Sequence, residues 1–200
     1  MLNKDTIFTI GRQFGSGGRE IGKALAKKLG LQYYDAELLV EAAEISGLLE
    51  ETISQFDEKA PAGKWQSYVF TPFHSCVSSL DSKIFQAQAA AIERVAEKSG
   101  CVLVGRCADY ILRDRPNTYS VFIHASTLSR LTRIRTRHPE DADKAEQMMR
   151  RIDKSRSWYY SFYTGKTWGA AESYDLSVRS DLLGVDGTVD LIAAFAKKAK

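Results

Sequence analysis

The sequence predicts an α/β protein in which helices cover both faces of a five-stranded parallel sheet. Short apolar runs that suit buried strands recur five times along the chain, and patterns typical of helices separate them. The first of these runs leads into a glycine cluster, and an amphipathic segment follows the cluster. Strands and helices that alternate in this order predict a doubly wound sheet, whose ligands bind at the carboxyl ends of the strands.

The elements follow one another as this plan requires. The expected strands are residues 7–10, 32–34, 101–104, 119–123 and 175–178. The expected helices are residues 18–29, 36–45, 78–98, 126–137, 142–160 and 189–198. Gly30, Gly47 and Gly100 end the first three helices, a position at which glycine is common. Two stretches, 49–75 and 137–169, fit the plan poorly, and we expect insertions there over the ligand edge of the sheet.

Composition excludes several classes of protein. A chain of 200 residues with 44% hydrophobic residues can bury the core of one domain. Its three cysteines form no CxxC pair, which argues against a zinc site or a disulfide framework and fits a reducing cytosol. The chain carries no signal-peptide pattern and no run of about 18 apolar residues, so we expect a cytoplasmic protein without a membrane partner. A net charge of +3 is too small to indicate nucleic-acid binding, and the aromatic segment 157–169 suits packing better than RNA stacking.

The glycine cluster has the composition of a phosphate-binding loop. In "IGRQFGSGGREIGKAL" the order is strand, tight turn and helix, which aims backbone N–H groups and the positive end of a helix dipole at an anion. The residues expected to line this loop are Gly11, Gly15, Ser16, Gly17 and Gly18. Loops of this kind usually carry a lysine, and Gly18 stands in its place.

Two arginines and one glutamate flank the cluster. Arg12 and Arg19 could each supply the cation that the lysine normally provides, or be solvated surface charges. We expect Arg19 to supply it, because it directly follows Gly18, and Arg12 is the second candidate. Glu20 either binds Mg²⁺ or acts only as a favourable acidic residue in the first turn of the helix.

Polar residues also follow the second and third expected strands. Asp35 is suited either to cap the next helix or to contact a substrate. Arg106, beside Gly105, is well placed to clamp a phosphate monoester, and Asp109 follows one helical turn later. These residues would face the glycine cluster at the switch point of the sheet.

A basic segment lies further along the chain. Residues 130–156 hold nine Lys and Arg against five Asp and Glu, a net charge of +4 in a chain whose total is +3. Such a run is either a solvated helix face or a set of mobile cations that neutralise a phosphoryl group during transfer. Helical spacing places Arg130 with Arg133, and Asp153 with Arg156, on shared faces. As mobile cations, Arg130 and Arg133 would contact the nucleotide.

With these features the sequence resembles the cytidylate kinase-like family, a branch of the P-loop nucleoside monophosphate kinases. The resemblance covers nearly the whole chain and rests on "TIGRQFGSGGREIGKALAKKLGLQYYD", "VLVGR", "RRIDKSRSWYYSFYTGKTWG" and "YDLSVRSDLLGVDGTVDLI". It implies a P-loop NTPase-like three-layer α/β/α fold in one domain, residues 1–200, with a helical acceptor-binding region at about 36–99 and a lid at about 130–169. It also implies ATP with Mg²⁺ as the phosphoryl donor and a nucleoside monophosphate such as CMP as the acceptor.

The family's functional residues are carried over motif by motif. The resemblance implies that the loop residues 15–18 hold the donor phosphates and that Arg106 contacts the acceptor. Arg151, Asp153 and Arg156 match the Arg/Asp/Arg pattern of the lid, which surrounds the transferred group. The chain departs from ordinary cytidylate kinases in having Gly18 for Lys, Glu20 near a Thr position and Cys107 for Asp. Two hypotheses stay open: a kinase of a small acceptor, and a nucleotide-binding module or sensor with little turnover.

Overall fold

The five strands form one parallel sheet, which confirms the predicted fold class. A computed structural model of the protein describes residues 4–35 and 79–199. The strands are β1 (Ile7–Arg12), β2 (Gln32–Tyr34), β3 (Cys101–Val104), β4 (Thr118–His124) and β5 (Leu176–Arg179). Their order in the sheet is β2-β3-β1-β4-β5, and every neighbouring pair is parallel. β1 therefore lies at the centre, with the switch point of the topology between β1 and β3.

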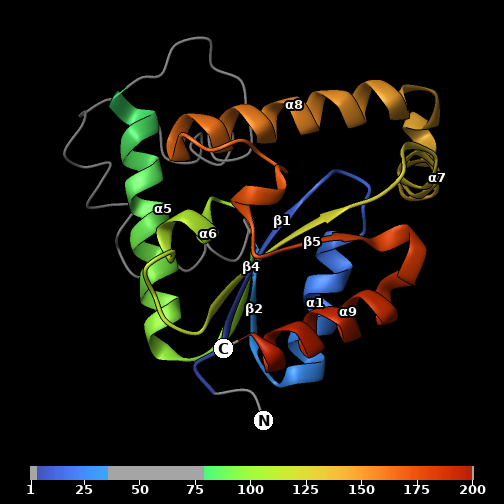
Figure 1. Ribbon diagram of the computed structural model, residues 1–200. Helices are drawn as coiled ribbons and strands as arrows, with labels where there is room; N and C mark the ends of the chain where they lie inside the picture. Colours follow the sequence, from blue (N-terminus) through green and yellow to red (C-terminus); the bar gives the residue numbers. More distant parts are fainter. Residues whose placement is uncertain (1–3, 36–78, 200) are drawn as a thin grey trace.

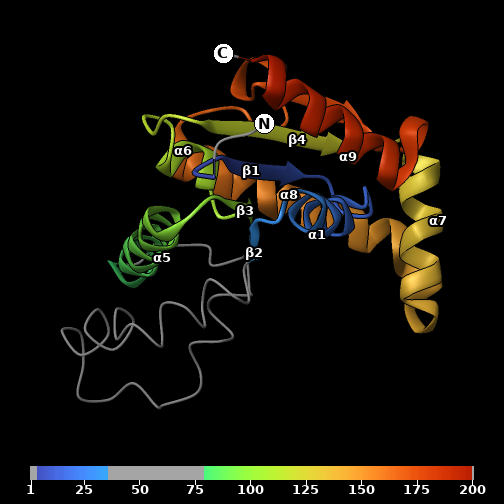
Figure 2. The ribbon, with the colours of Figure 1, turned by 90° about the horizontal axis from the view of Figure 1, so that it is seen from below.

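Helices cover both faces of this sheet and make three layers. They are α1 (Gly18–Leu29), α5 (Ser79–Lys98), α6 (Ala108–Ile111), α7 (Thr127–Arg137), α8 (Ala145–Thr164) and α9 (Ser180–Lys198), with 3₁₀ turns at Pro139–Lys144 and Ala171–Ser173. α1 and α9 lie on one face, and α5 and α6 lie on the other (Figure 1). The arrows of β1 and β4 point toward α7 (Figure 2). α7 and the helix that follows it therefore lie at the edge of the sheet where ligands of such folds bind.

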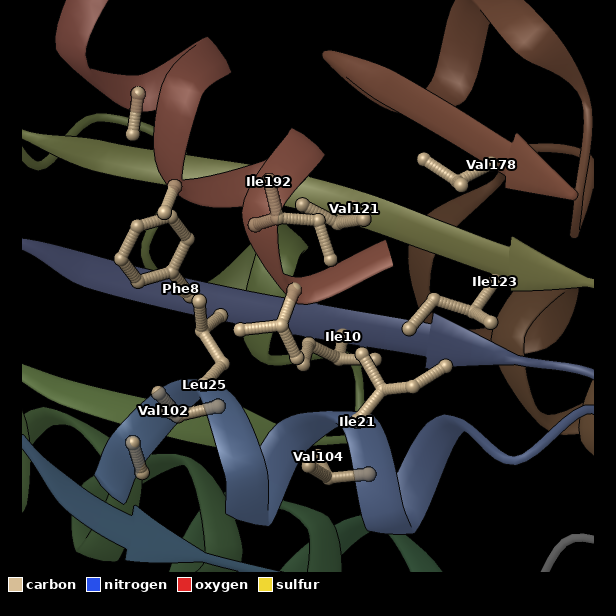
Figure 3. Close-up of a cluster of buried hydrophobic side chains, with 14 residues drawn as sticks. Phe8, Ile10, Ile21, Leu25, Val102, Val104, Val121, Ile123, Val178 and Ile192 are labelled. Carbon is tan, nitrogen blue, oxygen red and sulfur yellow. The ribbon is translucent and has the colours of Figure 1, made fainter. Parts of the chain in front are cut away.

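The larger core lies between the sheet and the helices α1 and α9 (Figure 3). Phe8 and Ile10 of β1 pack there with Ile21 and Leu25 of α1 and Ile192 of α9, and each is at most 1% exposed. Because helices cover both faces of the sheet, the central strands β1 and β3 are buried over four consecutive residues rather than at alternate ones. Each of these buried side chains stabilises the fold by roughly 1.5–3 kcal/mol. This core holds β1 and α1 rigidly at either end of the glycine loop.

An aromatic layer joins α8 to the second face of the sheet. The ring of Tyr160 stacks on that of Tyr174 with centroids 5.8 Å apart, and Phe122 of β4 meets Trp168 edge to face at 5.2 Å. Trp158 lies on the outer side of the same helix and is 42% exposed. The rings of Tyr159, Tyr160, Tyr163 and Trp168 therefore pack against the sheet side, in keeping with the packing interpretation, whereas Trp158 and Phe162 stack on each other at the surface.

Two helices differ from their predicted limits. α9 begins at Ser180 rather than at residue 189, because Gly184, with a φ of 67°, interrupts the helical pattern without ending the element. α8 runs from Ala145 to Thr164 and is preceded by a separate 3₁₀ turn. The expected helix 36–45, the stretch 49–75 and most of the acceptor-binding region lie outside the described residues. Among the residues that are described, no helix is long and apolar enough to cross a membrane.

Candidate active site

The glycine loop connects β1 to α1 at the carboxyl edge of the sheet. Gly15 and Gly17 have φ values of 78° and 81°, in the left-handed region that residues with a side chain rarely adopt. Gly17 is the N-cap of α1 and has no side chain that could bind the N–H groups of the first turn. These N–H groups are therefore suited to hold an anion, which the helix dipole would also attract.

Two serines fix the shape of the loop. Ser16 is 1% exposed, and its hydroxyl donates to the carbonyl of Gln13 at 2.8 Å. The hydroxyl of Ser180, the first residue of α9, donates to the carbonyl of Ser16 at 2.7 Å. Ser180 lies in the segment "YDLSVRSDLLGVDGTVDLI" that carries the family resemblance, but no role was predicted for it from the sequence; the signal available was a serine between the last strand and the last helix. The loop is thus braced from β4 and α9 before any ligand binds, since the N–H of Gln13 also donates to Ile123 at 3.0 Å.

The peptide groups of Phe14 tie the loop to both α7 and α8. The N–H of Phe14 donates to Asp153 Oδ1 at 2.8 Å, and its carbonyl accepts from Arg130 Nε at 2.7 Å. Arg130 and Asp153 also form an ion pair, in which the side chain of Arg130 is only 7% exposed. The structure therefore brings both residues to the loop, where they bind its backbone. Their predicted contacts with the nucleotide and the transferred group stay predictions.

Glu20, in the first turn of α1, lies against the basic face of α7. Its carboxylate pairs with Arg133 at 2.5 Å and also with Arg137. The guanidinium of Arg133 lies beside the loop, because a Cβ placed on Gly17 would be 3.2 Å from Arg133 Cζ. Glu20 thus holds two arginines of α7 next to the N-terminus of α1, at the place where an anion would compete for them. Its predicted role as a Mg²⁺ ligand stays a prediction.

Replacing Glu20 with glutamine would distinguish its contact with the two arginines from its predicted role as a Mg²⁺ ligand. Because Glu20→Gln removes the charge that holds Arg133 and Arg137, we expect ATP without Mg²⁺ to bind roughly threefold to tenfold more tightly. Titration calorimetry with and without Mg²⁺ measures this, with Glu97→Gln on the exposed side of α5 as the matched control. A variant that binds Mg²⁺·ATP more weakly than the wild type would identify Glu20 as a ligand of the ion instead.

Three arginines from separate elements gather beyond the end of β1. Arg12 ends β1, Arg106 follows β3, and Arg156 lies on α8, where its Nη1 donates to the carbonyl of Arg12 at 3.0 Å. Burial lowers the pKa of Arg12 well below its ordinary value, and repulsion from Arg156 and Arg106 adds to the effect. Burial likewise lowers the pKa of Arg156 to about 10. Within residues 4–35 and 79–199, neither Arg12 nor Arg156 forms a salt bridge with a carboxylate. The arrangement concentrates positive charge that an anionic ligand would balance.

A strained turn presents the second of these arginines. Gly105, Arg106 and Cys107 have consecutive φ values of 88°, 57° and 54°, all left-handed. Such a conformation costs of order 1–3 kcal/mol for each residue with a side chain, and strain of this kind clusters at functional sites. The guanidinium of Arg106 lies over the ring of Tyr159, 5.7 Å from its centroid. Burial raises the pKa of the Cys107 thiol, so this residue acts as a small apolar group under the turn.

Asp35 and Arg19 form a separate pair at the end of β2. Asp35 is 4% exposed and accepts from Arg19 Nε at 2.8 Å and from the Tyr33 hydroxyl at 3.2 Å. Burial and the adjacent Asp35 raise the pKa of Tyr33 to about 12. The structure therefore turns Arg19 toward the β2 side. Its predicted part in replacing the lysine is not favoured by this geometry, whereas Arg12 lies directly beside Gly18.

Three predicted residues face away from the N-terminus of α1. A Cβ on Gly11 would lie 2.9 Å from the ring of Phe122, so this glycine makes room for the aromatic layer. Asp109 accepts from the Tyr160 hydroxyl at 2.7 Å, and burial raises its pKa. Arg151 is exposed on α8, about 140° around the helix axis from the arginine five positions later. The functional roles of these residues stay predictions.

The sheet topology and the glycine loop together are those of the P-loop kinase fold. The chain belongs to the cytidylate kinase-like family, which it matches over residues 7–182. This confirms the resemblance seen in the sequence. A search among proteins with curated descriptions found no match.

Solved structures support the same fold. An uncharacterized protein from Eubacterium ventriosum is 30% identical, with a TM-score of 0.75 over 96% of this chain and 99% of that chain. A shikimate kinase from Bacteroides thetaiotaomicron is 13% identical, with a TM-score of 0.55 over 96% and 98% of the two chains. A shikimate kinase from Acinetobacter baumannii, in complex with shikimate, is 14% identical, with a TM-score of 0.54 over 98% and 95%. At these identities the two shikimate kinases share the fold alone.

Proposed function

We propose that the protein transfers the γ-phosphoryl group of ATP to a small acceptor in the cytoplasm, and that a nucleoside monophosphate such as CMP is the preferred acceptor. The observation that carries this proposal is the arginine cluster of Arg12, Arg106 and Arg156 beside the glycine loop. A loop of N–H groups suits the donor phosphates, and guanidinium groups grip phosphate oxygens through two hydrogen bonds at once. Phosphoryl transfer needs little more than such positioning and charge neutralisation.

The acceptor side supports a phosphorylated substrate. Arg106 follows β3 and Arg12 ends β1, so both lie at the switch point, where acceptors of open α/β sheets bind. A dianionic phosphate monoester would balance more of this charge than a monoanionic carboxylate would. An acceptor such as shikimate, which one of the similar structures contains, is therefore the comparison to make.

Mg²⁺ would accompany ATP at the loop. A phosphate-bound Mg²⁺ keeps several waters and needs only one or two carboxylates, so no dedicated protein cage is required. In the described part of the chain no group of three or more His, Cys, Asp or Glu is suited to hold a metal. Glu20 fits the role of a single carboxylate ligand if it releases an arginine. When bound, the ion would neutralise charge on the transferred group.

The second candidate function is nucleotide binding with little turnover, and Gly18 at the lysine position favours it. One assay separates the two. The protein is incubated with ATP, Mg²⁺ and each member of a panel of nucleoside monophosphates, shikimate and related hydroxy acids, and ADP release is measured. Acceptor-dependent ADP release that is fastest with CMP would support the proposal. ATP binding without ADP release from any acceptor would support the binding module.

The glycine loop should lose nucleotide when Gly17 becomes valine. Valine is strongly disfavoured at a φ of 81°, and its Cβ would crowd Arg133, so the first-turn N–H groups would be displaced. We expect ATP affinity, measured by calorimetry, to fall at least about tenfold while the circular dichroism spectrum of the fold is retained. Gly30→Val, at a φ of 67° with open space around it, is the matched control for left-handed strain. Equal ATP affinity in a folded Gly17→Val variant would place the nucleotide elsewhere.

A further inference from the structure

Gly18 is a glycine for a steric reason. It begins α1, and its φ is not in the left-handed region. A Cβ placed on Gly18 would lie 2.6 Å from the Cβ of Arg12 and 3.0 Å from its Cγ, closer than carbon atoms pack. The Cβ of Arg12 cannot move aside, because Arg12 is paired with Ile123 in the sheet. Any side chain at position 18, lysine included, would collide with the base of the Arg12 side chain.

A second glycine makes room for the other end of the same side chain. A Cβ placed on Gly105 would lie 2.0 Å from Nη1 of Arg12 and 3.0 Å from its Cζ. The side chain of Arg12 therefore runs from the N-terminus of α1 to the end of β3. β1 and β3 are neighbours in the sheet, and the switch point lies between them. The base of the side chain thus lies beside the glycine loop, and its guanidinium lies beside Gly105 at the switch point.

The charge of Arg12 is only weakly balanced by protein carboxylates, because the attraction of Asp35 is smaller than the opposing effects of burial, Arg156 and Arg106. Among the described residues no carboxylate forms a salt bridge with it, and the nearby charges of Arg156 and Arg106 repel it. A buried guanidinium that keeps its charge needs hydrogen-bond acceptors. Arg19, which also flanks the loop, instead pairs with Asp35 at 2.7 Å.

We propose that Arg12 replaces the missing lysine of the phosphate-binding loop, and that Gly18 and Gly105 are glycines because its side chain occupies the space beside them. The cation has moved from the first residue of the helix to the last residue of the strand. Gly18 is then part of a working site. This inference rests on the proposed function, because it names the residue that contacts the donor phosphates.

An exchange of the two residues tests the proposal. Arg12→Gly removes the cation and its Cβ, Gly18→Lys restores the usual lysine, and the double variant moves the cation back to the helix. The probes are inorganic tripolyphosphate and ATP, both without Mg²⁺, and affinity is measured by calorimetry. Gly18→Ala, alone and combined with Arg12→Gly, gives a second double-mutant cycle with a smaller side chain at position 18. Thermal unfolding confirms that each variant is folded.

We expect Arg12→Gly to weaken binding of both probes on the order of ten- to a hundredfold. Gly18→Lys alone should also weaken binding by at least about tenfold although it adds a cation, because it displaces Arg12. The double variant should recover at least about tenfold relative to the weaker single variant. Tighter or unchanged binding by Gly18→Lys would overturn the proposal. The proposal would also be overturned if Gly18→Ala weakened binding of the probes by the same factor whether residue 12 is arginine or glycine.

These measurements are independent of turnover. If no acceptor releases ADP but the two positions are coupled in binding, the inference stands and the kinase proposal fails. If ADP is released but the two positions are not coupled, the kinase proposal stands and the inference fails.

Discussion

Replacing Asp153 with alanine is expected to lower the free energy of unfolding by about 3 kcal/mol, because it leaves a buried arginine without its carboxylate. The side chain of Arg130 is 7% exposed and that of Asp153 is 18% exposed, so little water can replace the lost ion pair. The change also removes the acceptor of the Phe14 N–H, a hydrogen bond of 2.8 Å. Urea unfolding followed by tryptophan fluorescence measures the loss.

Asp190→Ala is the matched control for this prediction. Asp190 lies on α9 and pairs with Lys28, but the two side chains are 63% and 50% exposed. Pairs of this kind contribute about 0–1 kcal/mol, and both variants place alanine inside a helix. If Asp153→Ala cost no more than Asp190→Ala, the ion pair would not be what attaches the helices to the glycine loop.

This attachment limits how a lid could move. Arg130 and Asp153 both belong to the region 130–169 that we expect to act as a lid, yet both bind the peptide groups of Phe14. A motion of the whole region relative to the loop would break these contacts. A motion of the turn Pro139–Lys144 would not, because that turn lies beyond them at the junction of α7 and α8. We therefore place the expected movement at this junction, where protease cleavage that slows with both substrates present would reveal it.

The fold was predictable because its determinants are local. The central strand runs, such as Cys101–Val104, are apolar on both faces, and the helices between the strands have clear amphipathic periods and glycine ends, as at Gly30. The predicted start of α9 was wrong because its first turns contain two glycines, Gly184 and Gly187, and the left-handed φ of Gly184 interrupts the periodic signal. The anchoring of α8 to the glycine loop depends on the contact of Asp153, near the middle of the helix, with Phe14, 139 positions away. No local pattern contains that information.

The sequence predicted which residues lie at the site, but not which residue each charged side chain contacts. In the sequence Arg12 and Arg19 flank the glycine cluster, and adjacency to Gly18 favoured Arg19. In the structure Arg19 forms a salt bridge with Asp35 at the end of β2. The side chain of Arg12 extends to Gly105, a residue that the pairing of β1 with β3 brings close to it. A long side chain can reach several partners, and the tertiary structure decides which of them lies within reach, so its role cannot be predicted from local sequence. Glycines at a fixed spacing are easier to interpret, because the backbone itself requires them.

Replacing Arg156 with alanine is expected to lower kcat/KM on the order of 10³-fold, measured by ADP release with the best acceptor of the panel. Arg156 is held in place by its hydrogen bond to the carbonyl of Arg12 and by the ring of Phe14, 5.7 Å from its guanidinium carbon. Its remaining donors can therefore meet a transferred phosphoryl group without first being ordered. Arg156→Lys should recover only part of the loss, because lysine keeps the charge but not the two-pronged geometry.

Arg150→Ala is the control for this prediction, since Arg150 is exposed on the same helix and pairs with Glu146 at 2.7 Å. It should leave kcat/KM within about twofold of the wild type, as expected for a solvated surface arginine. Thermal unfolding of Arg156→Ala separates a catalytic loss from a folding defect, because a lost hydrogen bond to Arg12 alone should cost only about 1.5–3 kcal/mol. A folded Arg156→Ala variant with the activity of Arg150→Ala would mean that the charge developed in the transition state is met by Arg12 and Arg106 without α8.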